Sequence, residues 1–215
     1  MSSKTTNAII LLLTLISIMA GVLLYPALPN QIASHWNAAG EANGFQSKFW
    51  GVFLVPAMMI VFLFLRLITL RIDPLKQNIE SFKKYYDGFW IGINVFFLYI
   101  YGLTLAWNLG YRFNFTGMII PAMSVLFYGI GIMMEQSKRN WFMGIRTPWT
   151  LSSDIVWSKT HKLGGVLFKI AACLSLFGMM FQGDIAILCV LVIPILLASV
   201  TTVIYSYIEY RKQQK

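Results

Sequence analysis

The sequence predicts an all-α integral membrane protein, a bundle of six transmembrane helices with both termini in the cytoplasm. The chain is 58% hydrophobic and only 12% charged, with a mean hydropathy of +0.68. A soluble domain usually carries about 25% charged residues, so this chain has roughly half the charge that keeps a domain in water. Apolar runs long enough to cross a bilayer recur along the chain, and basic residues gather in alternate connections between them.

The apolar runs give the predicted spans. A bilayer core of about 30 Å requires roughly 20 apolar residues in a helix. We expect spans at 7–24, 50–70, 89–109, 117–134, 163–182 and 185–207. The first run follows Lys4, as a signal peptide would, but it ends in Tyr25-Pro26 without a small-residue cleavage pattern. It is therefore expected to stay in the protein as a span.

The basic residues predict the orientation. The connections after the second and fourth spans and the C-terminal tail hold Arg71, Lys76, Lys83, Lys84, Lys138, Arg139, Arg146, Lys159, Lys162, Arg211, Lys212 and Lys215. The remaining connections hold only Lys48 and Arg112. Because basic loops stay inside, both termini are predicted to be cytoplasmic. This distribution also accounts for the net charge of +9, so we expect no direct contact with nucleic acid.

The connection between the first two spans is predicted to lie outside the cell and to form a structured turn, because glycines and asparagines follow an aromatic pair. Its candidate binding residues are Pro29, His35, Trp36, Asn37, Gly40, Gly44 and Lys48. His35 suits a metal or a pH response, but a lone loop histidine is more often a hydrogen-bonding residue. The other histidine, His161, is predicted on the opposite face of the membrane, and Glu41 is the only carboxylate nearby. No tetrahedral ligand set can be assembled, so we expect no metal and no cofactor.

Residues 140–161, between the fourth and fifth spans, form the longest stretch that is neither plainly apolar nor a simple linker. It contains three of the seven tryptophans and charges of both signs. Gly144 permits a sharp turn, and Pro148 favours an extended Thr147. A helix beginning near Ser152 would place Trp157 and His161 on one side. The candidate binding residues here are Asn140, Gly144, Arg146, Thr147, Pro148, Trp149, Thr150, Trp157 and His161.

Two non-catalytic interpretations of this inner stretch stay open. It could be structural, with Trp and Arg side chains anchoring a helix pair among the lipid headgroups. It could equally be a binding surface for a cytoplasmic protein or a lipid headgroup, because Arg146, Lys159 and Lys162 suit an anion. Asp154 is expected to join these three basic residues in an electrostatic clamp on the loop.

A catalytic interpretation would combine Ser152 or Ser153 with Asp154 and His161. The aspartate and the histidine are seven residues apart, two helical turns, so they share a helix face without having to touch. No nucleophile-elbow or metalloprotease pattern accompanies them. We therefore assign no catalytic residue.

Polar residues also occur inside the expected spans, namely Asn94, Asn108, Glu135 and Lys169. Ionisable groups at this depth are costly, and Glu135 and Lys169 are expected to be partners near the inner face, the alternative being that Lys169 extends to the headgroups by itself. No chain of buried acids of the kind that a proton-coupled transporter needs is visible. Three glycines of the third span are predicted to let neighbouring helices approach closely, namely Gly88, Gly92 and Gly102.

Two stretches resemble motifs that occur together in one family. LPNQIASHWNAAGEANGFQSK, residues 28–48, is similar to the characteristic segment of the DUF1648 membrane domain, with Ala42-Asn43-Gly44 where Asp-Gly is commoner. NWFMGIRTPWTLSSDIVWSKTHKLGG, residues 140–165, resembles the signature of the SdpI family. With the spans, the resemblance covers most of the chain. It divides the protein into a DUF1648-like region, 1–75, and an SdpI-like region, 76–215.

This resemblance implies a multi-pass protein of the bacterial plasma membrane that gives immunity to a secreted peptide toxin of the SdpC type. The outer loop would bind the toxin, or the lipid region that the toxin attacks. At least one family member also acts as a receptor that holds a cytoplasmic transcriptional repressor at the membrane, a contact that the inner stretch would make. The alternatives are a membrane-embedded enzyme, such as a hydrolase or peptidase, or a small-solute transporter on the same scaffold.

Overall fold

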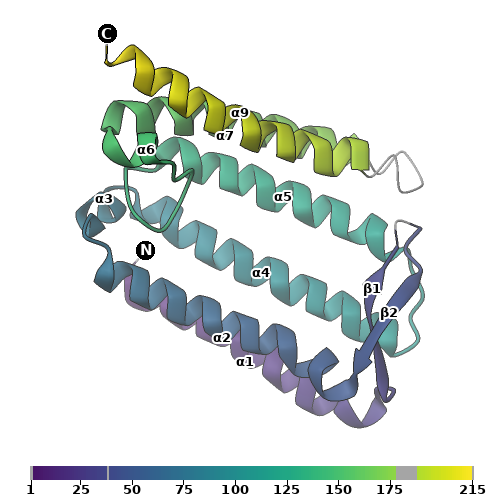
Figure 1. Ribbon diagram of the computed structural model, residues 1–215. Helices are drawn as coiled ribbons and strands as arrows, with labels where there is room; N and C mark the ends of the chain where they lie inside the picture. Colours follow the sequence, from purple (N-terminus) through teal and green to yellow (C-terminus); the bar gives the residue numbers. More distant parts are fainter. Residues whose placement is uncertain (1, 38, 178–187, 215) are drawn as a thin grey trace.

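Six long helices lie side by side in the computed structural model, which describes residues 2–37, 39–177 and 188–214 (Figure 1). They are α1 (Ser3–Leu24), α2 (Lys48–Ile72), α4 (Lys83–Asn108), α5 (Phe115–Gln136), α7 (Asp154–Phe177) and α9 (Ile193–Lys212), the last extended by the π-helical turn η3 (Leu188–Val192). Each is long and apolar enough to cross a membrane. The prediction of a six-span, all-α membrane protein is confirmed. The predicted end of span five at 182 and start of span six at 185 lie outside the described residues.

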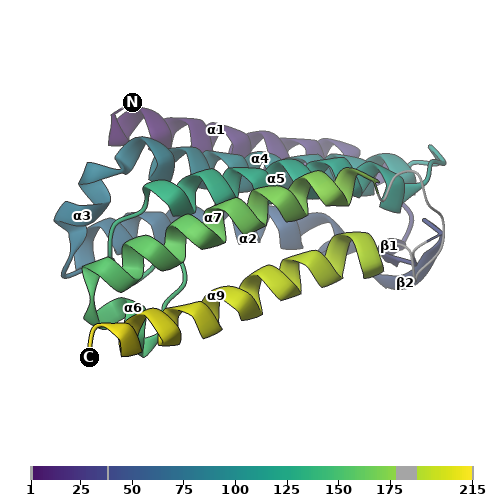
Figure 2. The ribbon, with the colours of Figure 1, turned by 90° about the horizontal axis from the view of Figure 1, so that it is seen from above.

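The helices are arranged as a cluster of three that is extended by a row. Helices α1, α2 and α4 pack on one another, α5 packs on α4, α7 on α5 and α9 on α7 (Figures 1 and 2). Both ends of the chain lie at one end of the bundle, with the short helices α3 (Lys76–Ser81) and α6 (Pro148–Ser152). We call this the motif end. The positive-inside rule predicts that it faces the cytoplasm.

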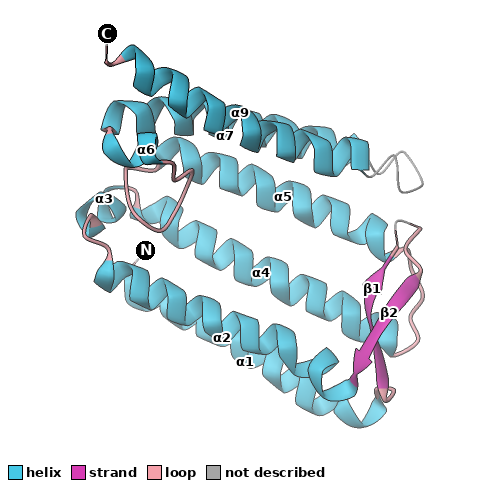
Figure 3. Ribbon diagram, in the orientation of Figure 1, coloured by secondary structure: helices cyan, strands magenta, loops and turns pink. Residues whose placement is uncertain are grey.

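The opposite end, which we call the hairpin end, carries a two-stranded antiparallel sheet (Figure 3). After the short 3₁₀ turn η1 (Tyr25–Ala27), strand β1 (Gln31–Trp36) pairs with β2 (Ala42–Ser47). The expected turn is the tip of this hairpin, where the Asn37 side chain accepts a hydrogen bond of 3.0 Å from the Glu41 N–H. The strands themselves escaped prediction because β2 contains Asn43 and Gly44, residue types that are depleted in strands.

Close helix approach occurs at glycines other than those predicted. A Cβ on Gly131 of α5 would lie 2.7 Å from the carbonyl oxygen of Gly165 on α7, so these two backbones touch. The prediction for α4 is wrong, because no described atom lies within 4 Å of where a Cβ would stand on Gly88, Gly92 or Gly102. In the described part of the chain, no helix therefore packs directly on α4 at these three glycines.

Charged groups on neighbouring spans form ion pairs. The predicted partnership of Glu135 on α5 and Lys169 on α7 is confirmed, with 2.7 Å between carboxylate and ammonium. A second pair, which sequence reasoning missed, joins Arg66 of α2 to Asp87 of α4 at 2.6 Å. The Arg66 side chain is fully buried.

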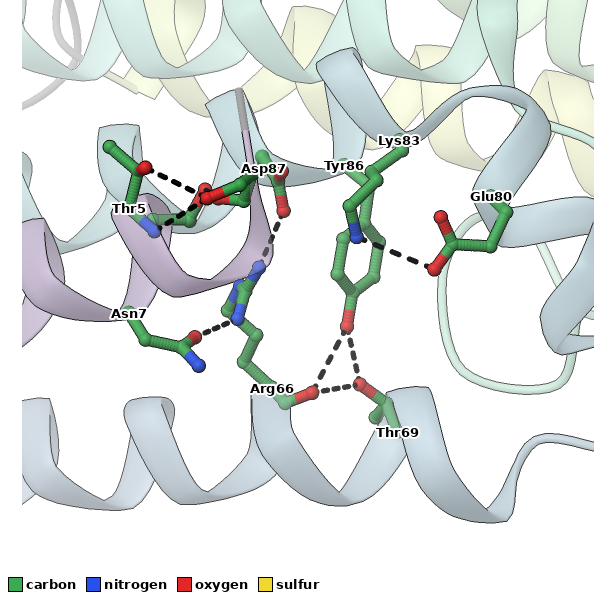
Figure 4. A network of polar contacts seen from close by, with 10 residues as sticks. Thr5, Asn7, Arg66, Thr69, Glu80, Lys83, Tyr86 and Asp87 are labelled. Atoms are coloured by element: carbon green, nitrogen blue, oxygen red, sulfur yellow. Dashed lines mark hydrogen bonds and ion pairs between the residues drawn. The ribbon is translucent and has the colours of Figure 1, made fainter.

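The Arg66 guanidinium ties three helices together (Figure 4). Its Nη2 faces Asp87, and its Nη1 donates to the side-chain oxygen of Asn7 on α1. Beside it, the Thr69 hydroxyl donates to the Arg66 carbonyl at 3.0 Å and bonds to the Tyr86 hydroxyl. Water cannot solvate polar groups inside a bilayer, so these partners must replace it.

Removing one partner of this buried pair should destabilise the bundle strongly. We expect Arg66→Met or Asp87→Leu alone to cost about 3–5 kcal/mol, because each leaves an uncompensated buried charge, and the double variant to recover most of that loss. The apparent Tm of the detergent-solubilised protein measures all three. Additive losses in the double variant would mean that the two residues act independently.

Candidate functional site

The β-hairpin is fixed to the helices by Asn108, the last residue of α4. The side chain of Asn108 accepts from the Ala33 N–H at 2.8 Å and donates to the Ala33 carbonyl at 3.1 Å. An amide that donates and accepts in this way imitates a neighbouring strand, so it closes the free edge of β1. Thr116 of α5 adds a second tie by donating to the Asn37 carbonyl at 2.8 Å.

Aromatic stacking holds the hairpin tip against the same helix ends. The ring of Trp36 stacks on Phe115 with centroids 3.6 Å apart and meets Trp107 edge-on at 5.8 Å. The Arg112 guanidinium covers Trp107 at 3.8 Å from the ring centroid. The hairpin is therefore an ordered platform rather than a loose loop.

The structure divides the predicted outer residues into two groups. Trp36, Asn37 and Gly40 build the platform, the last by packing against Asn114. Pro29 and His35 are exposed. The remaining two, Gly44 and Lys48, are half-buried, with Gly44 against the His35 side chain and the Lys48 ammonium over the Tyr25 ring.

His35 contacts Asn43, whose side-chain oxygen lies 2.5 Å from its Nδ1. Within the described residues no three metal-ligating side chains gather. The other histidine lies at the motif end, as predicted, so the two cannot share a ligand.

At the motif end, residues 137–153 form a compact segment with many internal hydrogen bonds, which we call the knot. The buried Asn140 side chain accepts from the N–H groups of Phe142 and Met143, at 3.0 and 2.7 Å, and donates to the Lys138 carbonyl. The Asn140 side chain therefore stabilises the first turn of the knot, so its role is structural.

The knot packs against His161, which is buried on α7. Its ring stacks on Trp157 with centroids 3.9 Å apart. The Ile145 N–H donates to Nε2 at 2.9 Å, so Nε2 carries no proton. Nδ1 must then donate to the Trp157 carbonyl, 2.9 Å away. His161 is therefore a neutral imidazole whose Nε2 accepts a hydrogen bond from the backbone of the inner stretch, at Ile145.

The Thr147-Pro148-Trp149-Thr150 segment begins helix α6. Thr147 and Thr150 form a reciprocal capping box, and Pro148 occupies the first turn, where its missing N–H costs nothing. The Thr147 hydroxyl also bonds to Ser206 of α9 at 3.1 Å, and Trp149 packs on Tyr207. The helix predicted to begin near Ser152 is α7, which begins at Asp154 and follows α6 after Ser153.

The prediction that Asp154 joins Arg146, Lys159 and Lys162 in an electrostatic clamp is wrong. Asp154 pairs with Arg139 at 2.8 Å, and Lys159 pairs with Glu209 of α9 at 2.7 Å. These pairs join α7 to the start of the knot and to the last helix. Arg146 is exposed and donates to the Trp141 carbonyl at 2.7 Å.

The residues of the catalytic interpretation are engaged elsewhere. Both ring nitrogens of His161 bond to backbone groups, and the Ser152 hydroxyl donates to the Trp149 carbonyl at 3.0 Å. Ser153 donates to Gln213 at 2.8 Å. This geometry aligns no nucleophile with a base.

The knot is also bonded to the first half of the chain. The buried carboxylate of Asp73, just after α2, accepts from the Trp141 N–H at 3.0 Å, and Asn78 of α3 donates to the Arg139 carbonyl at 2.7 Å. Sequence reasoning did not identify either residue, although an aspartate at the start of a turn favours a side-chain bond to the backbone two residues on, and the Asp73 carboxylate accepts from the Leu75 N–H at 2.7 Å.

The turn at Gly144 gives a test of this knot. Gly144 has φ +103°, and a Cβ there would collide with Nε2 of His161. We expect Gly144→Ala to lose about 1–2 kcal/mol of backbone preference and a further about 1–3 kcal/mol as the Ile145–His161 bond is displaced. The apparent Tm in detergent measures the loss.

Gly110→Ala is the matched control. Gly110 has φ +105° with no described atom within 4 Å of a Cβ. The Gly110→Ala variant should therefore lose only the free energy that comes from the backbone conformation. Equal Tm losses for the two variants would show that the contact with His161 contributes nothing.

Comparison with known proteins agrees with this architecture. A domain of unknown function (DUF1648) matches residues 12–60, which cover most of α1, the hairpin and the first half of α2. The SdpI/YfhL protein family matches residues 136–206, which cover the knot, α7 and most of α9. The chain is 27% identical over 207 residues to the immunity protein SdpI of Bacillus subtilis (strain 168), an alignment that spans 96% of each protein. No solved structure matches. Both matched regions contain the motifs identified in the sequence, so this multi-pass membrane protein is similar to the SdpI/YfhL protein family over residues 136–206 and to the DUF1648 domain over residues 12–60.

Proposed function

We propose that this protein gives a bacterial cell immunity by binding a secreted peptide toxin at the hairpin end of the bundle. Similarity to an immunity protein along nearly the whole chain supports the immunity role. The observation that carries the choice of site is the hairpin itself, an ordered sheet with one edge closed and the other open.

The open edge belongs to β2. Ala33 turns its N–H and C=O away from β2, toward Asn108. In an antiparallel pair, two residues that lie opposite each other either both point their N–H and C=O groups toward the partner strand or both point them away from it. Phe45 lies opposite Ala33, so its N–H and C=O face outward, and no described residue bonds to them. Such an edge binds an extended peptide by adding it as a third strand.

The surroundings of this edge suit an apolar peptide that acts at a membrane. Phe45, Phe49 and Trp50 are each more than half exposed and lie along β2 and the first turn of α2. Aromatic side chains at this level favour the bilayer interface. A toxin entering the outer leaflet would meet both the strand edge and this aromatic group.

A second role, holding a cytoplasmic repressor, finds support in exposed side chains at the motif end. Trp141 is 49% exposed, and Arg146 beside it has no ion pair among the described residues. An Arg146→Ala variant that captured repressor as well as the wild type would remove this proposal.

The toxin site is tested by survival. A toxin-sensitive bacterium that expresses the chain should survive a peptide toxin of the SdpC type that kills cells with an empty vector. Phe45→Pro should abolish protection, because it removes the outward N–H while leaving the ladder bonds of β2 in place. Phe45→Ala keeps that N–H and should retain part of the protection.

Each variant must first be shown in the membrane at wild-type level. Point substitutions are preferable to deleting the loop, because buried Ile32 and the Asn108 contact make the hairpin part of the fold. Full protection by Phe45→Pro would exclude strand addition at this edge. Killing of cells that express the wild-type protein would contradict immunity to this toxin.

A further inference from the structure

A groove runs along the outside of the bundle between α4 and α5, away from both the hairpin and the knot. Its volume is about 610 Å³, and its walls include Gly88, Gly92 and Tyr99 of α4 and Pro121 and Gly129 of α5. The remaining walls are almost all aliphatic or aromatic. Val125, at its border, is 74% exposed, so the groove opens toward the surrounding lipid.

The groove is hollow because three of the residues that line it are glycines, which have no side chain. A Cβ on Gly88, Gly92 or Gly129 would meet no described atom within 4 Å. Gly88 and Gly92 are one helical turn apart and therefore lie on one face of α4. An empty groove would forfeit van der Waals contacts along its whole length, so something apolar must fill it.

The two ends of the groove differ. At the hairpin side, the Tyr99 hydroxyl donates to the Met118 carbonyl at 3.1 Å and bridges α4 to α5. At the motif side stands Lys84, an exposed cation. The nearby acids are engaged elsewhere, Glu80 with Lys83 and Asp87 with Arg66. Lys84 is therefore left to bind an anion from outside the chain.

The dimensions fit one lipid leaflet. From Lys84 to Tyr99 the helix rises about 22 Å, and half of a bilayer with its headgroups measures about 20–22 Å. The space suits a slender chain with a negative group at one end.

We propose that this groove binds one acyl chain of an anionic phospholipid, with the phosphate on Lys84. The glycines accept the chain, Tyr99 closes the far end, and the ammonium of Lys84 selects a negative headgroup over a neutral one. This site is independent of the proposed toxin site.

Native mass spectrometry of the detergent-solubilised protein tests the proposal. The wild type, titrated with phosphatidylglycerol, should retain one molecule at least about tenfold more tightly than phosphatidylcholine, a difference of about 1.4 kcal/mol. Gly92→Leu fills the groove and should lower retention of both lipids. Lys84→Gln should lower retention of phosphatidylglycerol to the level of phosphatidylcholine.

Gly102→Leu is the matched control, because Gly102 has the same open surroundings on α4 but lies outside the groove. It should bind phosphatidylglycerol as the wild type does. Wild-type retention by Gly92→Leu would overturn the proposal, as would equal losses in Gly92→Leu and Gly102→Leu. A second copy of the chain or a peptide bound in place of lipid would also overturn it.

Discussion

The buried ion pair between Arg66 and Asp87 sets how α2 lies against α4, and the hairpin end depends on that register. Strand β2 continues directly into α2, while Asn108 at the end of α4 holds β1. A slide of α2 by one turn against α4 would move the hairpin by about 5.4 Å and break the bonds of Asn108 to Ala33. The ion pair at one end of the bundle thus positions the proposed toxin platform at the other.

At the motif end, polar groups must likewise find partners within the protein, as Arg66 and Asp87 do inside the bundle. Its non-helical backbone lies next to the bundle, so its polar groups need partners within the protein. Asn140, Thr150 and His161 supply them, and Asp73 links the knot to the first half of the chain. Most of the distinctive residues of this motif therefore have structural tasks. The hairpin end has the more accessible backbone and aromatic surface.

The sequence predicted what depends on composition and spacing. The length of the apolar runs predicted the six helices, and the opposite charges of Glu135 and Lys169 predicted their pairing. Partners set by tertiary packing could not be predicted. Asp154 met Arg139 instead of Lys159, because α6 brings the two ends of the knot together. Likewise, a glycine such as Gly92 fits either a helix contact or a groove, and only the position of neighbouring helices decides between them.

In the proposed complex the toxin binds as an added strand on β2 while the knot stays unchanged. Amide hydrogen exchange of the purified protein in nanodiscs, with and without the peptide toxin of the survival test, examines this directly. We expect slower exchange in residues 42–47 on addition of the peptide, because the outward N–H of Phe45 gains a partner, and unchanged exchange in residues 140–161. Unchanged exchange in 42–47, or slowing confined to 140–161, would contradict the proposal.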